Sequence, residues 1–454
     1  MRSPDVFFPS FRALKYRRGM RLLCLSSIAT LVFSTGCMSS LYRPAGGTHS
    51  SNAGNFSRTV FIGDSLTAGF QSGSLLDTAQ PNGYANLIAK QVKIQLALPL
   101  IAPPGAPAVL ELVSVGPPPV IHQADGVTTG RDDPSVQATD LAVPGHLLTD
   151  LINRQPTLVP TSNEDLITEL VLGFPGLAEG RDYTQLQWAE QLQPSTLFVW
   201  IGSNDALVAD ETGMPSSMTP VATFTTEFTQ LMQALQSKTT ANLIVGNVPD
   251  VTEVPYLTPG SVVLAEFSAS SGIPAAQLSA TLGIGATDLV NPNGITQIEA
   301  ILAGKQTGAV TDAGFLSAAE AATVQQTIQQ YNAVIAQQVS AAGATLVDIN
   351  TELTKIKNSP PTINGTPTSF AFLGGIFSLD GIHPTNTGYA LLANIFIDRM
   401  NAAIATKIPD VNVGPIAAAD PLFPSNLPKA AVRMRIPNAA AKSLDWMLKP
   451  RGGK

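Results

Sequence analysis

The sequence of 454 residues is almost free of cysteine: there are two, Cys24 and Cys37, and both lie near its N-terminal end. The long remainder therefore has no disulfide framework and no thiolate metal site. Histidine is equally scarce, and its four positions show no pairing typical of a zinc site. They are His49, His122, His146 and His383. These shortages argue against a metalloenzyme, and we expect no metal and no cofactor.

Charge is also sparse, because only 13% of the residues are charged where about a quarter is usual. The apolar content of 44% is ample for a buried core and argues against a disordered chain. The net charge is −7, yet residues 1–36 hold six Lys/Arg against one Asp, which leaves −12 for the rest. So acidic a body offers no phosphate-binding surface, and nucleic acid is not an expected partner.

The N-terminal 36 residues have the pattern of a secretory signal. Basic residues at 17–21 precede an apolar run over 22–33, which is shorter than the roughly 20 residues that a membrane-spanning helix needs. The long stretch before Met20 is unusual for a signal, and Met20 would itself start a conventional one. Residues 1–36 are therefore predicted to be removed on export.

The end of this signal, Thr35-Gly36-Cys37, resembles the lipobox of bacterial lipoproteins, in which the cysteine becomes the acylated N-terminus. Ser34 departs from that pattern, since an aliphatic residue usually stands there, and an ordinary signal with an incidental cysteine is the alternative. The resemblance implies a lipid on Cys37 and a protein of the cell envelope. Met38 after the cysteine favours the outer membrane, with the protein facing the periplasm or the cell surface.

Residues 37–57 are rich in Ser, Gly and Asn without periodicity, which is typical of a flexible tether. Beyond residue 58, short strand-like runs alternate with helix-like segments, as in a parallel sheet with crossover helices. The candidate strands are 58–62, 109–114, 138–143, 196–201, 242–247 and 344–349. Helices are expected over about 83–97, from Ser317 with a capping box to Glu320, and after His383.

Three further segments interrupt or follow this alternation. Residues 97–135 are rich in proline and predict an ordered excursion rather than a central strand. Residues 251–315 form an almost uncharged insertion, which is either a lid or acyl-binding wall, or a structural appendage. Residues 408–454 form a basic, proline-containing tail, either disordered or folded back on the acidic body. The main domain is thus predicted to span 58–407.

The most informative stretch is Val60 to Gly69, where an apolar strand breaks at Gly63 and presents Ser65 at the start of a helix. The free N–H groups at a helix N-terminus favour developing negative charge, so a serine there is well placed as a nucleophile. Alone, Gly-Asp-Ser-Leu could equally be an ordinary turn. Far downstream, Asp380 stands three residues before His383, the carboxylate and imidazole that an activated serine needs.

The segment around Ser65 and the segment with Asp380 and His383 are two short blocks of sequence. Two more blocks lie between them: one ends in Gly145, and the other contains Asn204. With all four blocks in order, the chain resembles the SGNH (GDSL-type) hydrolases, a family of esterases and lipases. The resemblance implies a three-layer α/β/α sandwich with a mainly parallel sheet. It also implies a nucleophile at Ser65, a base at His383 oriented by Asp380, and an oxyanion hole formed by Ser65, Gly145 and Asn204.

Each block also has a purely structural interpretation. Gly145 can end a strand in a turn, Asn204 can cap a helix, and His146 has no carboxylate at short fixed spacing. The rival α/β-hydrolase fold is excluded because its nucleophile elbow, Gly-x-Ser-x-Gly, would need glycine where Thr67 stands.

A carboxylic ester hydrolase acting on acyl lipids or similar esters is the favoured function. A deacetylase of acetylated glycans and a catalytically degenerate, lipid-anchored binding module are the alternatives. The apolar residues of the insertion are expected to line an acyl groove. They are Val262, Val263, Leu264, Phe267, Ile273, Leu282 and Ile284.

Overall fold

The computed structural model describes residues 54–116 and 119–428, and it is built around a parallel sheet of four strands. In spatial order these are β1 (Thr59–Gly63), β4 (Thr196–Trp200), β5 (Asn242–Gly246) and β9 (Thr345–Val347). All neighbours pair in parallel. Every residue of β1, β4 and β5 is buried, which explains why these strands are continuous apolar runs in the sequence.

A further extended segment, the predicted strand 138–143, lies along the free edge of β1. Phe61 donates its N–H to the Thr139 carbonyl (2.9 Å), and Leu141 and Val143 donate to the carbonyls of Phe61 and Gly63 (2.9 and 3.1 Å). The predicted strands 58–62, 138–143, 196–201, 242–247 and 344–349 therefore lie side by side. Their carboxyl ends meet at one edge of the sheet.

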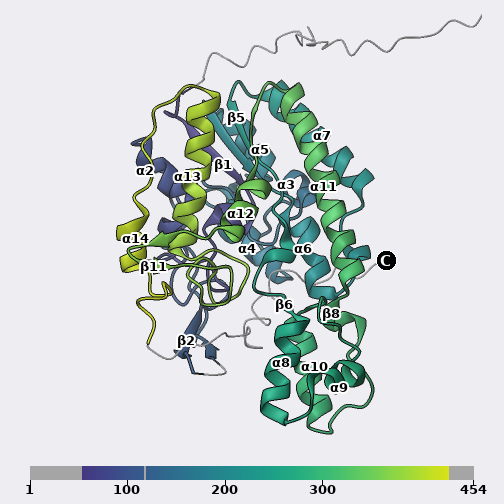
Figure 1. The fold of residues 1–454 in the computed structure, drawn as a ribbon. Helices are drawn as coiled ribbons and strands as arrows, with labels where there is room; N and C mark the ends of the chain where they lie inside the picture. The colour runs from purple at the N-terminus through teal and green to yellow at the C-terminus, as the bar shows by residue number, and fades with distance from the viewer. Residues whose placement is uncertain (1–53, 117–118, 429–454) are drawn as a thin grey trace, which may run out of the picture. The chain divides into compact units, whose positions relative to one another are not determined.

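Helices cover both faces of this sheet, which confirms the predicted three-layer α/β/α arrangement (Figure 1). One face packs against α2 (Tyr84–Gln91), α12 (Ile349–Asn358) and α13 (Asn386–Ala403). The other face is covered by α3 (Leu148–Asn153), α4 (Asn163–Leu172), α5 (Gln185–Leu192), α6 (Ser203–Thr212), α7 (Val221–Lys238) and α11 (Ala318–Ala341). Alternate residues of β1 face the two layers, Phe61 on the first side and Val60 and Ile62 on the second.

The three predicted helices are present. Helix α11 begins after Ser317, whose side chain accepts from the Glu320 N–H while Glu320 accepts from the Ser317 N–H. Helix α13 follows His383, and its N-cap is Thr385. Helix α2 is shorter than the predicted 83–97 because the backbone turns to positive φ at Lys93.

The predicted strand 109–114 is a strand, but it does not belong to the parallel sheet. As β2 (Leu110–Ser114) it pairs antiparallel with β3 (Val120–Gln123). Only Leu110 of β2 and Ile121 of β3 are buried. A hairpin covered on one side does not have the buried faces of a central strand, so residues 97–135 form an excursion, as their prolines predicted.

The insertion folds as a small helical subdomain. It contains β6 (Thr258–Pro259), α8 (Gly260–Ser271), α9 (Ala275–Leu282), β7 (Leu289–Val290), α10 (Pro292–Leu302) and β8 (Phe315–Leu316). Strands β6, β7 and β8 form a separate antiparallel sheet at the base of these helices (Figure 1).

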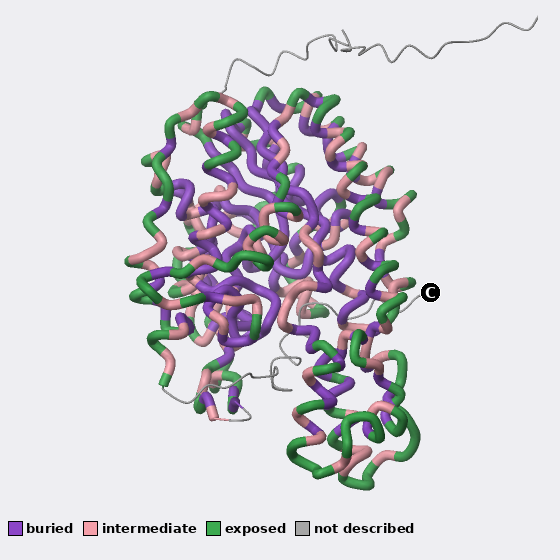
Figure 2. The backbone as a smooth tube through the Cα atoms, viewed as in Figure 1, coloured by how far each residue is buried: buried purple, intermediate pink, exposed green. Residues whose placement is uncertain are grey.

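Most of the apolar side chains that were predicted to line an acyl groove do not do so. Val263, Leu264, Phe267, Leu282 and Ile284 are buried in a core of the subdomain's own, and Ile273 packs against that core. In Figure 2 the part of the chain that Figure 1 labels α8, α9 and α10 has a largely exposed outer surface and some buried stretches. A unit of three short helices needs these side chains for its own stability, which leaves Val262 as the predicted wall residue that faces a hollow.

The first part of the predicted tail packs on the main domain instead of leaving it. Ile408 and Val411 are buried beside α13, and Phe423 is buried with Ala417 of α14 (Val413–Ala419). The side chain of Asp420 accepts from the N–H and hydroxyl of Thr387 (2.8 and 2.7 Å). The body therefore extends to at least residue 428, past the predicted boundary at 407.

At the other end, the backbone carbonyl of Asn55 accepts from the hydroxyls of Ser195 and Thr196, so the last residues of the predicted tether contact β4. The predicted signal 1–36, with Cys37, most of the tether and the rest of the tail, 429–454, lies outside the described residues. Within the described ranges, no helix has the length and apolar character needed to cross a membrane.

Short elements complete the described fold. They are the 3-10 turns η2 (Gln80–Asn82), η3 (Leu177–Glu179), η4 (Pro215–Ser217), η5 (Val251–Glu253) and η6 (Asp312–Gly314), and the hairpin of β10 (Thr362–Ile363) with β11 (Thr366–Pro367).

Candidate active site

Ser65 is the first residue of α1 (Ser65–Ala68), a single helical turn that begins directly after β1. Asp64 is its N-cap, and the carboxylate accepts from the Leu66 N–H (3.1 Å). The break at Gly63 has a steric cause, because a Cβ there would lie 2.2 Å from the backbone oxygen of Trp200. The sequence thus places the serine at the carboxyl edge of the sheet with its side chain at a helix start.

The structure brings the predicted nucleophile, base and orienting acid into one chain of hydrogen bonds. The Oγ of Ser65 lies 2.8 Å from Nε2 of His383, although 318 positions separate the two residues. Nδ1 of the same imidazole lies 3.0 Å from Oδ2 of Asp380. All three side chains are buried, with 2%, 1% and 0% exposed.

The carboxylate of Asp380 is held by several donors in addition to His383. Its Oδ1 accepts from the backbone N–H groups of Ile382 (2.9 Å) and His383 (2.8 Å), and its Oδ2 accepts from the N–H of Gly73 (2.7 Å). Burial alone would raise the pKa of Asp380, but the neighbouring His383 and the backbone N–H groups of His383 and Ile382 together lower it. The acid is therefore held ionised, as the orienting partner of an imidazole must be.

Gly145 and Asn204 lie at the same edge of the sheet. Gly145 follows the extended segment that pairs with β1, and its φ of +80° is a conformation that favours glycine. Asn204 is the second residue of α6, which begins after Gly202 at φ +110°. One amide hydrogen of Asn204 is donated to the His146 carbonyl (3.0 Å), which leaves the other for a ligand in the cavity that Asn204 lines.

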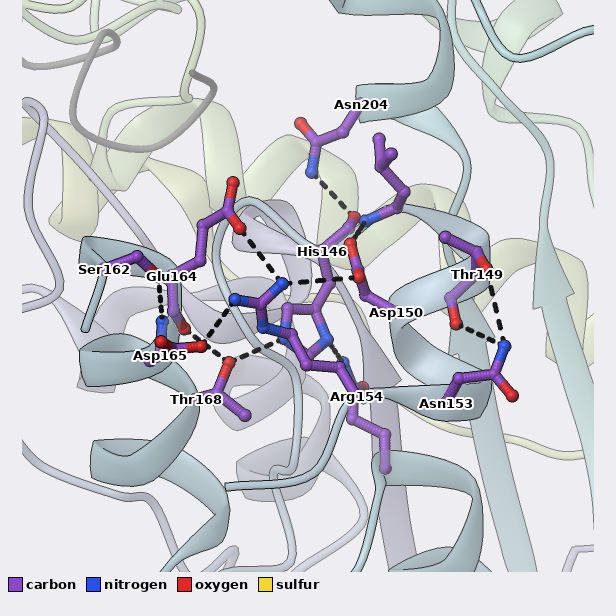
Figure 3. A network of polar contacts seen from close by, with 12 residues as sticks. His146, Thr149, Asp150, Asn153, Arg154, Ser162, Glu164, Asp165, Thr168 and Asn204 are labelled. Carbon is purple, nitrogen blue, oxygen red and sulfur yellow. Dashed lines mark hydrogen bonds and ion pairs between the residues drawn. The ribbon is translucent and has the colours of Figure 1, made fainter. Parts of the chain in front are cut away.

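His146, the residue after Gly145, is buried within a hydrogen-bonded network (Figure 3). Its Nε2 lies 2.9 Å from Oγ1 of Thr168, and its Nδ1 lies 3.0 Å from Nε2 of Gln185. Gln185 also accepts from the Gly63 N–H (2.9 Å) and donates to the Gly63 carbonyl (3.0 Å). Sequence reasoning missed Gln185, because no local motif marks a residue 122 positions from the glycine it binds.

His122 lies apart from the site. His122 is exposed on β3, where its Nε2 lies 3.1 Å from Oε2 of Glu111, and His49 lies outside the described residues.

Two buried carboxyl groups support the loops of the site. The pKa of Asp64 is raised to about 7, mainly by burial. The pKa of Asp205 is also raised to about 7 by burial, although Asp205 accepts from Thr219 (2.6 Å) and from the Leu148 N–H (3.0 Å). The second bond ties α6 to the start of α3, and so keeps Asn204 near the Gly145 turn.

A cavity of about 60 Å³ opens beside Ser65, and its walls are mostly apolar. The polar side chains of the wall include Ser65, Asn204 and His383, so the reactive groups face the cavity. The apolar walls come from widely separated parts of the chain. They include Leu66, Leu207, Val251, Val254, Leu353, Ile356, Phe370, Ile376, Phe377, Ile382, Leu391 and Leu392.

Among residues 54–116 and 119–428, no group of three or more His, Cys, Asp or Glu side chains is arranged to hold a metal ion. The arrangement around Ser65 instead has the geometry of an activated serine.

Comparison with known proteins gives a family. Residues 59–396 match the model of the family described as GDSL-like Lipase/Acylhydrolase. Among solved structures, an acetylxylan esterase from Geobacillus stearothermophilus is similar at 12% identity and a TM-score of 0.34, covering 75% of this chain and 93% of that one. An alpha/beta hydrolase enzyme from the metagenome of Lake Arreo, Spain, is similar at 12% identity and a TM-score of 0.33, covering 76% and 95%.

At this identity and TM-score the two structures indicate no substrate for this chain, and no curated protein matches it. The family match, in contrast, extends over most of the chain and includes every block that carries the resemblance, from Ser65 to His383. The chain therefore belongs to the GDSL-like lipase/acylhydrolase family, and its chemistry is ester hydrolysis.

Proposed function

We propose that the protein is a serine hydrolase that cleaves carboxylic esters through an acyl-enzyme, with Ser65, His383 and Asp380 as its triad. The observation that carries this proposal is the unbroken set of contacts from Ser65 Oγ to His383 Nε2 and from His383 Nδ1 to Asp380 Oδ2. Each distance lies in the range that proton transfer and tautomer control require.

In the first half of the reaction, Ser65 Oγ attacks the ester carbonyl carbon while its proton moves to Nε2 of His383. The carbonyl oxygen takes up the electron pair of the broken π bond. It would be received by the N–H groups of Ser65 and Gly145 and by the free amide hydrogen of Asn204. The intermediate then collapses: the bond to the alcohol oxygen breaks, and His383 returns its proton to that leaving oxygen.

In the second half, water takes the place of the alcohol. His383 accepts a proton from the water as it attacks the acyl carbon, and the proton then passes to Ser65 as the acid departs. Throughout both halves, Asp380 accepts the Nδ1–H bond and stabilises the imidazolium that forms each time.

The cavity walls favour an apolar acyl ester as substrate over an acetylated glycan. A sugar presents hydroxyl groups that need hydrogen-bonding partners, because burying an unpaired hydroxyl costs about 1–3 kcal/mol. Apolar side chains dominate the wall around Ser65 and supply few such partners.

The test is ester hydrolysis by the purified protein and by Ser65→Ala, with short-chain chromogenic esters as substrates. Ser65→Ala should lower kcat by several orders of magnitude. Ser195→Ala is the matched control, since Ser195 is also a buried serine but lies at the other end of β4. Wild-type protein without activity would favour the degenerate binding module, and a higher rate on acetylated xylan fragments than on alkyl esters would favour the glycan deacetylase.

We also propose that Cys37 carries a lipid that anchors the protein to the outer membrane. The support is the Thr35-Gly36-Cys37 sequence after an apolar run, followed by Met38. Cys37→Ser should release or mislocalise the protein on fractionation of a bacterial host. If the variant stayed with the membranes after a high-salt wash, something other than this lipid would hold it there.

A further inference from the structure

A second hollow of about 340 Å³ adjoins the active-site cavity. It lies where the helical subdomain faces the main domain: β6, α8 and β7 contribute Pro259, Val262 and Leu289, and the loop before the triad acid contributes Phe370 and Phe372. Glu253, Val254 and Phe370 line both spaces. The two hollows are therefore neighbours along one wall.

The charged side chains of the second hollow neutralise each other. Among its lining residues, Glu253 and Lys357 are the charged ones, and their Oε1 and Nζ atoms form an ion pair at 3.0 Å. Thr354 also lies near the other oxygen of Glu253 (3.5 Å). With its two charges paired and Val254, Val262, Leu289 and Phe372 on its walls, this hollow suits an apolar group.

The size of the first cavity indicates which apolar group needs the second. A cavity of about 150 Å³ holds the six carbons of benzene, or roughly 25 Å³ per carbon. By that measure the space of about 60 Å³ beside Ser65 holds two or three carbons of an acyl group. A longer acyl chain must continue beyond it, and the neighbouring apolar space lies past Val254 and Phe370.

We infer that the second hollow is a subsite for the distal part of a medium- or long-chain acyl group, which passes from Ser65 between Val254 and Phe370 toward Val262. This inference rests on the proposed ester hydrolysis and adds the substrate class: esters of fatty acids of about eight carbons or more. The subdomain then contributes to binding through the surface of β6, β7 and α8, while its buried core has a structural role.

The experiment measures kcat/KM for p-nitrophenyl butyrate, octanoate and dodecanoate below their critical micelle concentrations. Wild type should show a rise from butyrate to dodecanoate. Val262→Trp fills the hollow from a half-buried position, and each methylene it excludes should cost roughly fourfold in kcat/KM. Excluding two methylenes therefore lowers the ratio of dodecanoate to butyrate about 16-fold.

Ala276→Trp is the matched control, because Ala276 is exposed on α9 of the same subdomain, and it should keep the wild-type ratio. Val262→Phe should also lower this ratio. Because its side chain is smaller, it keeps the test valid if Val262→Trp does not fold. The inference is overturned if wild type prefers butyrate. It is also overturned if Val262→Trp and Val262→Phe have the same ratio of kcat/KM for dodecanoate to kcat/KM for butyrate as Ala276→Trp. A protein that hydrolyses none of the three esters would instead refute the proposed function itself.

A separate observation concerns His146. The direction of each hydrogen bond at its ring assigns this residue a role. Thr168 donates its single hydroxyl hydrogen to the Glu164 carbonyl (2.6 Å), so at the ring it accepts from Nε2–H of His146. The Gln185 amide nitrogen donates to Nδ1 (3.0 Å). In this arrangement Nε2 donates a hydrogen and Nδ1 accepts one.

This ring connects the parts that must act together. Through Gln185 it is tied to both backbone groups of Gly63, two residues before Ser65. Its own backbone follows Gly145 directly, and its carbonyl accepts from the side chain of Asn204 (3.0 Å). The geometry points to His146 as a positioning residue, which fixes the oxyanion donors relative to the nucleophile without touching substrate.

The test compares His146→Phe, which keeps a ring of similar size and removes both ring hydrogen bonds, with His146→Asn, whose side-chain oxygen can still accept from Gln185. His146→Phe should lower kcat roughly tenfold or more with little change in KM, and His146→Asn should recover part of the loss. Trp188→Phe is the control, since it removes a comparable buried hydrogen bond, to the Leu172 carbonyl (3.1 Å), and should leave kcat unchanged.

A double variant separates positioning from simple destabilisation. If His146 acts through the oxyanion donors, adding His146→Phe to Asn204→Ala should lower kcat less than the product of the two single effects. Effects that multiply, or a kcat for His146→Phe within twofold of Trp188→Phe, would refute the assignment.

Discussion

Asn204 offers the sharpest quantitative check on the proposed mechanism, because a single amide hydrogen is expected to stabilise the transition state. In Asn204→Ala the cavity loses one of three proposed oxyanion donors, and the others, the N–H groups of Ser65 and Gly145, belong to the backbone and remain. Removing one such donor costs about 2.7–4 kcal/mol in the transition state, or about 10²–10³ in kcat. KM should change little, because the oxyanion exists only in the transition state.

The same substitution also removes the hydrogen bond from Asn204 to the buried His146 carbonyl. A buried hydrogen bond contributes about 0.5–1.5 kcal/mol, so the variant should be less stable as well as slower. The assay therefore pairs kcat and KM for a butyrate ester with thermal unfolding followed by circular dichroism. Asn401→Ala is the control: the Asn401 amide also binds backbone, donating to and accepting from Ile408 (2.8 and 2.9 Å), but at the far end of α13.

Two results would refute this reasoning. If folded Asn204→Ala kept kcat within twofold of wild type, Asn204 would not be an oxyanion donor. If KM rose and kcat stayed constant, its amide would bind substrate and transition state equally.

Three further substitutions test other parts of the structure. Asp380→Asn should lower kcat about 10⁴-fold by favouring the wrong imidazole tautomer; a loss below tenfold in steady-state assays would contradict the triad. Burial raises the pKa of Asp140 to about 8, so its contribution to stability is complete below about pH 4, the usual pKa of an unfolded aspartate, and is lost as pH rises through 8. Between these two pH values the unfolding free energy should therefore fall by on the order of 1.4 kcal/mol for each step of one in pH. Asp140→Asn, measured by urea denaturation at pH 5 and 8.5, should show a smaller fall than wild type, and some fall remains because burial also raises the pKa of Asp64 and Asp205; an equal fall in both proteins would contradict it. Phe423→Ala should cost about 3–5 kcal/mol if residues 408–428 belong to the folded body, and an unchanged melting temperature would place them outside it.

The sequence was most informative where a function depends on residues at fixed local spacing. Asp380 and His383 are three positions apart, and Ser65 follows a buried strand after one residue, so local patterns identified all three as candidates for an activated serine. The parallel strands were visible for a similar reason, since strands buried on both faces must be continuously apolar. The strand at 110–114 also looked apolar, but whether it pairs with a hairpin partner or with the central sheet is a long-range property.

The residues that sequence reasoning missed act through distant contacts. Gln185 on α5 binds Gly63 across 122 positions, and nothing in its neighbourhood distinguishes it from a solvated helix residue. The apolar residues of the insertion are visible in the sequence, but the same composition suits either a substrate groove or a separate hydrophobic core. Only the packing of α8, α9 and α10 against one another shows that most of them serve the core.

The base of the helical subdomain has a consequence for how such a protein can change over time. The chain enters through β6 and leaves through β8, and both strands pair with β7 in the same small sheet. Entry and exit are thus two strand spacings apart, or about 10 Å. A segment whose ends are so close can be shortened, lengthened or replaced without moving β5 or α11, so the wall that faces the second hollow can be exchanged as a unit while the catalytic edge of the sheet stays as it is.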